Sequence, residues 1–142
     1  MFEATRIMVP VSGGPLDEEL MVQACEMAKR AHAKVIAVHV IEVKRVLPLE
    51  TDLPREIEKG ERILQKAEEV ARKIRQPIET DLLQARDAGT AIVEEAQRRG
   101  VDLIIIGLRY RKRYDQFYIG GTVTHVLKNS SCRVCAWREP IG

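Results

Sequence analysis

The segment Val101–Gly107 constrains the fold more than any other part of the chain. Its centre, Leu103–Ile106, is an uninterrupted apolar run, and Gly100 precedes it. A short apolar run of this kind is typical of a strand in a parallel sheet that helices cover on both faces. Parallel strands are joined by crossover connections, usually helices, so strand and helix patterns should alternate along the rest of the chain.

The remaining sequence shows this alternation from end to end. The acidic segment Asp17–Glu19 suits a helix N-terminus, and Pro54 suits the first turn of a long second helix. Asp87 can cap a third helix, which Gly100 ends, and a fourth helix is expected over Thr122–Asn129. The other expected strands are Arg6–Val11, Val35–Ile41, the segment containing Ile78, Thr80 and Leu82, and Cys132–Trp137.

The order β-α-β-α-β-α-β-α-β predicts an α/β fold, a doubly wound five-stranded parallel sheet with helices on both faces. The expected strand order is 3-2-1-4-5. The chain has 142 residues and shows no internal repeat or linker, so one domain over residues 1–142 is expected.

Composition and charge narrow the classes of partner. The longest apolar run is far too short to span a membrane, and the N-terminus lacks the pattern of a signal peptide. Three cysteines, an odd number, fit a reducing compartment, so a cytoplasmic protein is expected. The net charge is only +2, although Arg109 and Arg111–Arg113 concentrate four cations in five residues. This distribution favours a local anion site over a nucleic-acid-binding face.

The expected topology places a ligand where the winding direction reverses, between strands one and four. The segments that follow these two strands are Ser12–Gly14 and Gly107–Gly121. Both contain glycines and lead into helices, an arrangement that aims backbone N–H groups at phosphates. A site for a small phosphate-bearing ligand is therefore expected between them.

At these residues the whole chain resembles the universal stress protein family. The resemblance rests on the opening Ile-Met-Val-Pro-Val of Ile7–Val11, the strand Val35–Ile41, the turn Ala85–Gly89 and the last third of the chain. Nucleotide-binding members carry a G-x2-G-x9-G-[S/T] signature, whose first and third glycines match Gly107 and Gly120. The resemblance implies an adenine nucleotide such as ATP or AMP, Mg²⁺ accompanying ATP, and a homodimer formed through Cys132–Trp137.

Three positions depart from the family pattern. Tyr110 stands in place of the second glycine, and Gly121 in place of the Ser or Thr, although Thr122 follows it. Ser12 replaces an acidic residue. Arg109, Arg111 and Lys112 offer charge that could hold a phosphate instead. The expected ligand-binding residues are Pro10, Val11, Ser12, Gly13, Val40, Gly107, Arg109, Tyr110, Arg111, Gly120, Gly121 and Thr122.

Other reactive side chains fit structural roles better. Cys132 and Cys135 lie three apart on an expected strand, so they should face opposite sides of the sheet and form neither a redox pair nor a metal site. His39 fits a core or dimer-face position, and His125 could approach a ligand but has no nucleophile beside it. Ser12–Gly14 also resembles the phosphate loop of ATP pyrophosphatases, but the residues after it do not match.

Three functional interpretations remain open at this point. The first is a dimeric binding or regulatory module that holds a nucleotide or another phosphate ligand. The second is a dimeric interaction module of the same family without nucleotide. The third is a slow ATP-hydrolysing or nucleotide-transferring enzyme, for which Asp17 and Asp115 are the nearest acids. The residues favour binding over catalysis, and no catalytic or metal-ligating residue is assigned.

Overall fold

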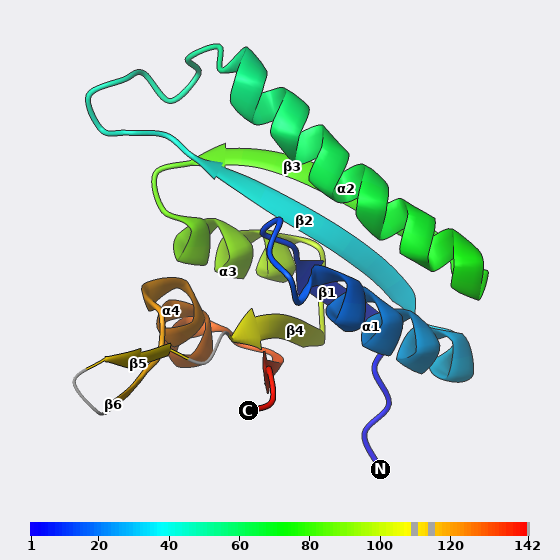
Figure 1. The fold of residues 1–142 in the computed structure, drawn as a ribbon. Coiled ribbons are helices and arrows are strands. Elements are labelled where there is room, and N and C mark those ends of the chain that lie inside the picture. Colours follow the sequence, from blue (N-terminus) through cyan, green and yellow to red (C-terminus); the bar gives the residue numbers. More distant parts are fainter. Residues whose placement is uncertain (109–110, 114–115, 142) are drawn as a thin grey trace.

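The computed structural model describes residues 1–108, 111–113 and 116–141, with only the backbone of residues 111–113 and 116–118 (Figure 1). Its main sheet has five parallel strands in the order β3-β2-β1-β4-β7, as predicted. The strands are β1 (Arg6–Pro10), β2 (Lys34–Glu42), β3 (Ile78–Ala85), β4 (Leu103–Leu108) and β7 (Arg133–Arg138).

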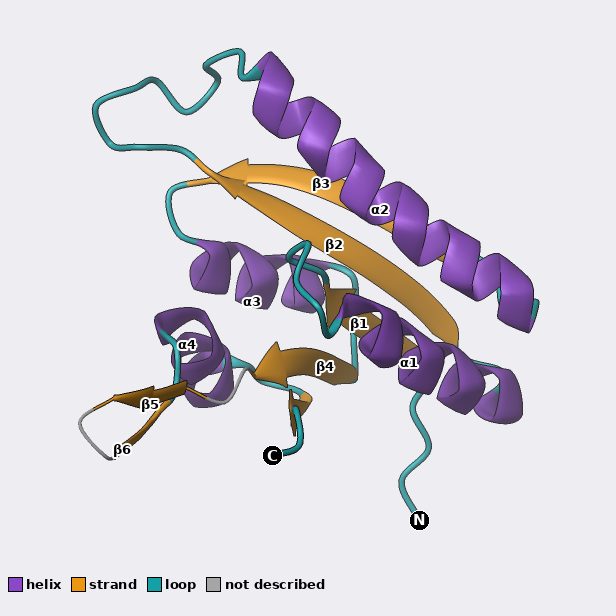
Figure 2. Ribbon diagram, in the orientation of Figure 1, coloured by secondary structure: helices purple, strands orange, loops and turns teal. Residues whose placement is uncertain are grey.

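Helices cover both faces of this sheet (Figure 2). On one face α1 (Asp17–Ala31) and α2 (Pro54–Ile74) pack over residues such as Ile7 and Ile105. On the other face α3 (Ala88–Arg98) and α4 (Gly121–Asn129) pack over Met8 and Ile104. Successive residues of β1 and β4 thus enter opposite cores, which explains why both segments are apolar without alternation.

The predicted helix boundaries rest on identifiable contacts. The Asp87 carboxylate caps α3 by accepting from the Gly89 N–H, at 3.2 Å. At the other end Gly100 has φ +66°, and the Gly100 and Val101 amides donate to Gln97 and Ala96. Glycine relieves the steric cost of this left-handed conformation, so the helix ends there.

The segment after β4 differs from the expected basic loop. It contains a hairpin of two short antiparallel strands, β5 (Arg111–Arg113) and β6 (Gln116–Tyr118), which stands off the main sheet in Figure 1. Their opposed register, Arg111 to Tyr118 and Arg113 to Gln116, folds the segment back on itself before α4 begins. Three-residue strands are too short for sequence periodicity to reveal them.

β7 forms one edge of the sheet and places Trp137 beside the predicted ligand loop. The Cα of Trp137 pairs with Gly107 in the register with β4. The Trp137 side chain does not simply project from an exposed edge, because it packs against the α1–α2 core and its indole N–H donates to Glu19 of α1. No helix in the described part of the chain is long and apolar enough to cross a membrane.

Candidate functional site

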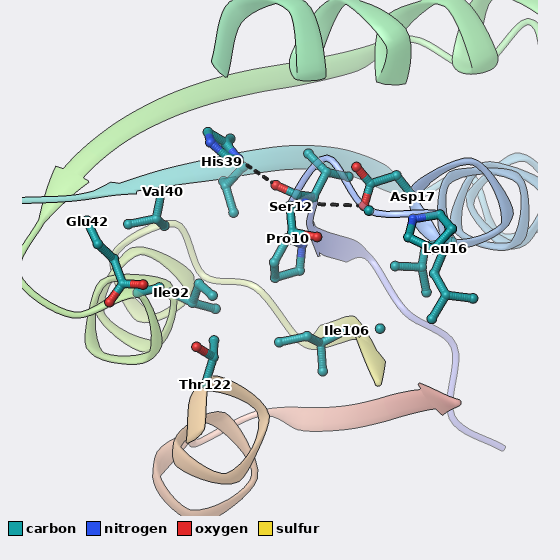
Figure 3. A pocket seen from close by; sticks show the side chains of 17 residues that line it. Pro10, Ser12, Leu16, Asp17, His39, Val40, Glu42, Ile92, Ile106 and Thr122 are labelled. Atoms are coloured by element: carbon teal, nitrogen blue, oxygen red, sulfur yellow. Dashed lines mark hydrogen bonds between the residues drawn. The ribbon is translucent and has the colours of Figure 1, made fainter. Parts of the chain in front are cut away.

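A pocket of about 320 Å³ lies at the C-terminal ends of β1, β2 and β4, where the strand order reverses (Figure 3). Residues that follow β1 line it, together with Gly107 of β4 and Thr122 of α4, so both segments singled out in the sequence border the pocket. The predicted ligand-binding residues that line the pocket are Pro10, Val11, Ser12, Val40, Gly107 and Thr122.

The remaining predicted residues lie elsewhere or outside the described part of the chain. Gly13 faces a second hollow between α1 and α2, on the far side of the β1–α1 turn. Gly120 and Gly121 are exposed at the start of α4, next to Thr122. Arg109 and Tyr110 lie outside the described residues, as do Tyr114 and Asp115, and only the backbone of Arg111 is described.

The structure adds residues that sequence reasoning missed. His39 and Glu42 of β2 line the pocket beside Val40, and Ala88 and Ile92 contribute from α3. The signal for His39 and Glu42 was present, because both stand near the C-terminal end of a strand beside the switch point. The contribution of α3 depends on how that helix packs, which no local pattern records.

Three helix N-termini converge on this pocket. α1, α3 and α4 begin at Asp17, Ala88 and Gly121, and the pocket is lined by Asp17, Ala88 and Thr122. Each N-terminus carries partial positive charge and amides without intrahelical acceptors. Gly120, the N-cap of α4, has no side chain that could accept from them. The pocket therefore favours an anion near α4.

Asp17 stabilises the β1–α1 turn through two hydrogen bonds. Its carboxylate accepts from the backbone amides of Ser12, at 3.2 Å, and Gly13, at 2.7 Å. Burial raises the pKa of Asp17, an effect that these two hydrogen bonds oppose. Asp17 thus shapes the turn, and both of its oxygens are already engaged by the chain itself.

His39 forms part of the pocket wall. Its Nδ1 lies 2.7 Å from the carbonyl oxygen of Val11. Because a carbonyl only accepts, Nδ1 carries the hydrogen, which fixes the orientation of the ring. Gly60 of α2 leaves room for this ring, since a Cβ there would lie 3.0 Å from His39 Cδ2. His39 is thus half-buried in the pocket wall and not in the core, which was one of the two positions expected from the sequence.

His125 lies at the junction of α3 and α4 and is not among the residues that line the pocket. Its Nε2 is 3.5 Å from the Thr90 hydroxyl, which donates to Asp87 at 2.8 Å. The ring packs so closely on Gly89 that a Cβ there would lie 2.9 Å from the His125 Cβ. This contact sets the spacing between the two helix N-termini.

The cysteines occupy the positions expected of structural residues. Cys132 packs against the α3–α4 core and Cys135 against the α1–α2 core, so the two thiols face opposite sides of the sheet as predicted. Gly107 also has a packing role, because a Cβ there would lie 3.0 Å from Leu20 Cδ1 of α1. Its lack of a side chain is thus explained in part without any ligand.

A protein-family model matches almost the whole chain. The model of the universal stress protein family matches residues 3–138. The chain belongs to the universal stress protein family. A universal stress protein of Methanocaldococcus jannaschii is 27% identical over 141 residues, which cover 95% of this chain and 82% of that protein.

Solved members of the family share the architecture. A universal stress protein from Archaeoglobus fulgidus superposes with a TM-score of 0.80 at 22% identity, covering 93% of this chain and 97% of that one. A universal stress protein from the same organism in complex with dAMP superposes with a TM-score of 0.75 at 20% identity, covering 95% of this chain and 98% of that one. An Arabidopsis thaliana family member with AMP bound superposes with a TM-score of 0.67 at 14% identity, covering 96% of this chain and 92% of that one. At these identities the likeness shows the fold alone.

Proposed function

We propose that this universal stress protein binds an adenine nucleotide in the pocket between β1 and β4. The observation that carries the proposal is the convergence of three helix N-termini on a pocket with apolar walls. A nucleotide matches both features, since its phosphates suit the helix N-termini and its base suits the apolar walls formed by Pro10, Val40 and Ile106. Nucleotides bound to related proteins support the same ligand class.

The phosphates would lie at the start of α4. The free amides of its first turn and the Thr122 hydroxyl can donate to phosphate oxygens there. Arg109, Tyr110 and Arg111, which the sequence placed in the same site, would add charge and a ring from the preceding segment. The group of residues proposed to bind ligand is therefore the predicted one without Gly13, which lines another hollow, and with His39 and Glu42 added.

Magnesium would enter with ATP and not through a site of the protein's own. Among the described residues, no group of three or more His, Cys, Asp or Glu side chains could hold a metal ion. The phosphates and water would supply most of its ligands, as is usual for Mg²⁺. Asp17 is engaged by two backbone amides, so its carboxylate is a poor general base, which favours a binding module over a hydrolase.

Denaturation of the purified protein followed by chromatography of the released small molecules tests the proposal directly. Calorimetric titration of the protein with ATP, AMP and cyclic AMP then gives the affinities. We expect Thr122→Ala to weaken binding about tenfold, as the loss of a hydrogen bond to a charged group does. Thr124→Ala, two residues further along the same helix, is the matched control, because Thr124 does not line the pocket and its hydroxyl donates to the Gly120 carbonyl, at 3.0 Å. Absence of both released nucleotide and heat would overturn the proposal.

The proposed assembly is a homodimer formed through β7. Among the described strands β7 pairs with β4 and is an edge strand of the main sheet. An unpaired edge is a template for another strand. We also propose that this dimer works in the cytoplasm as a regulatory module, consistent with three free cysteines in the chain.

A further inference from the structure

Glu42 is held at the mouth of the pocket by the backbone around it. It is the last residue of β2 and pairs with Ala85 of β3. The next amide, of Val43, donates to the Ala85 carbonyl at 2.8 Å. Beyond it the Arg86 guanidinium donates to the carbonyls of Lys44 and Leu47, at 2.6 and 2.7 Å. The backbone position of Glu42 is therefore fixed from both sides.

The Glu42 carboxylate is free to meet a ligand. Asp17 and Glu42 are the two acidic side chains among the described residues that line the pocket. Both carboxylate oxygens of Asp17 accept from amides of the β1–α1 turn. Among the described residues, no side chain or amide donates to the carboxylate of Glu42. In Figure 3 Glu42 lies beside Val40, part of the wall that suits the base, and away from Asp17.

The helix N-termini at this pocket attract anions, but the Glu42 carboxylate favours ligand groups that donate hydrogen bonds. It repels phosphate and accepts only from N–H or O–H groups. On a nucleotide such donors are the 6-amino group of adenine and the hydroxyls of the ribose. In dinucleotide-binding α/β domains, by analogy, an acidic side chain accepts from a ribose hydroxyl.

We propose that Glu42 is a specificity-determining residue that accepts a hydrogen bond from the nucleoside part of the ligand and rejects nucleosides lacking that donor. This inference rests on the proposed nucleotide binding and names the group that reads the ligand. A phosphate on the sugar at this position is disfavoured by the same charge.

Calorimetry with AMP, IMP, 2′-deoxy-AMP and 3′-deoxy-AMP identifies the donor. IMP replaces the 6-amino group by an oxygen, and each deoxy compound lacks one hydroxyl. We expect wild-type protein to bind AMP about tenfold more tightly than at least one of these three analogues. Loss of affinity for IMP points to the amino group, and loss for a deoxy compound points to that hydroxyl.

Glu42→Ala removes the acceptor and should abolish this preference while AMP still binds. Glu42→Gln keeps an oxygen that accepts hydrogen bonds but removes the charge. If the amino group is read, the glutamine amide can also donate to the IMP oxygen, so the ratio of the AMP and IMP affinities should approach one. Glu68→Ala, which removes the same group from the exposed face of α2, should keep the wild-type preference. Thermal unfolding of each variant checks its fold.

Three results overturn the inference, and the last is distinguishable from the first two. Wild-type protein that binds AMP and all three analogues alike, or Glu42→Ala that keeps the wild-type ratios, overturns the role of Glu42 alone. Wild-type protein that binds none of the four nucleotides overturns the proposed function and this inference with it.

Discussion

Gly13 shows how a single residue shapes the candidate site. Its φ of +87° lies in the left-handed region, and a Cβ there would lie 2.8 Å from Ile63 Cδ1 of α2. The amides of Ser12 and Gly13 both donate to Asp17. The turn that walls the pocket therefore depends on a glycine for its backbone and on an acid for its hydrogen bonds.

Gly13→Ala should lower the free energy of unfolding by about 1–2 kcal/mol, because alanine is strained at positive φ and its Cβ meets Ile63. Urea denaturation followed by circular dichroism measures the change. Gly121→Ala is the control, since a Cβ there meets nothing within 4 Å and its φ is not positive. Equal effects of the two substitutions would contradict the account of this turn.

Gly121→Ser tests the alignment in which Gly121 occupies the Ser or Thr position of the family signature. The start of α4 has room for the added side chain, and its hydroxyl would face the predicted phosphate. We expect the substitution, alone or with Tyr110→Gly, to tighten ATP binding several-fold, measured by calorimetry, as one new hydrogen bond to a charged group would. No change in either variant would instead favour Gly121–Thr122 as the native signature pair.

Cys25 should be inert in the folded protein. It is fully buried in the core beneath α1, and burial raises the pKa of its thiol to about 11. Because the thiolate is the reactive form, iodoacetamide at pH 7 should leave Cys25 unlabelled until urea unfolds the chain. Mass spectrometry of peptides locates the label. The half-buried Cys132 and Cys135 provide the internal comparison, and rapid native labelling of Cys25 would contradict its burial.

At the scale of elements, ion pairs connect the C-terminal end of α3 to β3. Glu95 is buried and accepts from Arg98 and Arg99, with 2.6 Å between Arg99 Nε and Glu95 Oε2. Arg99 also contacts Glu79 and Asp81 of β3, each at 2.9 Å. A shared arginine of this kind fixes the angle at which α3 delivers Ala88 and Ile92 to the pocket.

Glu95→Gln should destabilise the protein by about 2 kcal/mol at pH 7, since it removes the charge that both arginines face. Burial opposes ionisation of Glu95, but the hydrogen bonds from Arg98 and Arg99 outweigh it and lower the pKa to about 2. The stabilisation is therefore complete above the unfolded pKa of 4.5 and is lost as the pH falls towards 2. Burial and the contact with Glu95 raise the pKa of Asp81, which works in the opposite direction.

Urea denaturation of both proteins between pH 3 and pH 7 measures this difference. The gap in the free energy of unfolding between wild type and Glu95→Gln should narrow as the pH falls below 4.5. Glu94→Gln, an exposed neighbour on the same helix, should show almost no effect. A gap that is constant with pH would mean that Glu95 contributes through packing rather than charge.

The sequence predicted elements well where periodicity and end signals agree, as for α3 between Asp87 and Gly100. It predicted the sheet order because apolar strands and crossover helices leave few topologies. The β5–β6 hairpin escaped prediction because its strands have three residues each. Of the candidate site, the two glycine-containing segments were predicted. Glu42 was missed although its place at the C-terminal end of β2 pointed to the pocket, and Ile92 was missed because α3 reaches the pocket only through tertiary packing.

At the scale of the whole molecule, the two edges of the sheet differ. β3 is the edge strand on one side, beneath α2, and β7 is the edge strand on the other. If β7 forms the proposed homodimer, sedimentation equilibrium at micromolar concentrations should give twice the 16.1 kDa mass of one chain. A mass of one chain at every concentration would contradict the proposal.

The register between β4 and β7 has an optical consequence. The chain contains a single tryptophan, Trp137, whose Cα pairs with Gly107 at the wall of the pocket and whose indole donates to Glu19. Its emission therefore comes from one defined place, between the candidate ligand site and the edge of the sheet at which the homodimer is proposed. Quenching that saturates with nucleotide and a spectral shift that depends on protein concentration would separate ligand binding from assembly without any added dye.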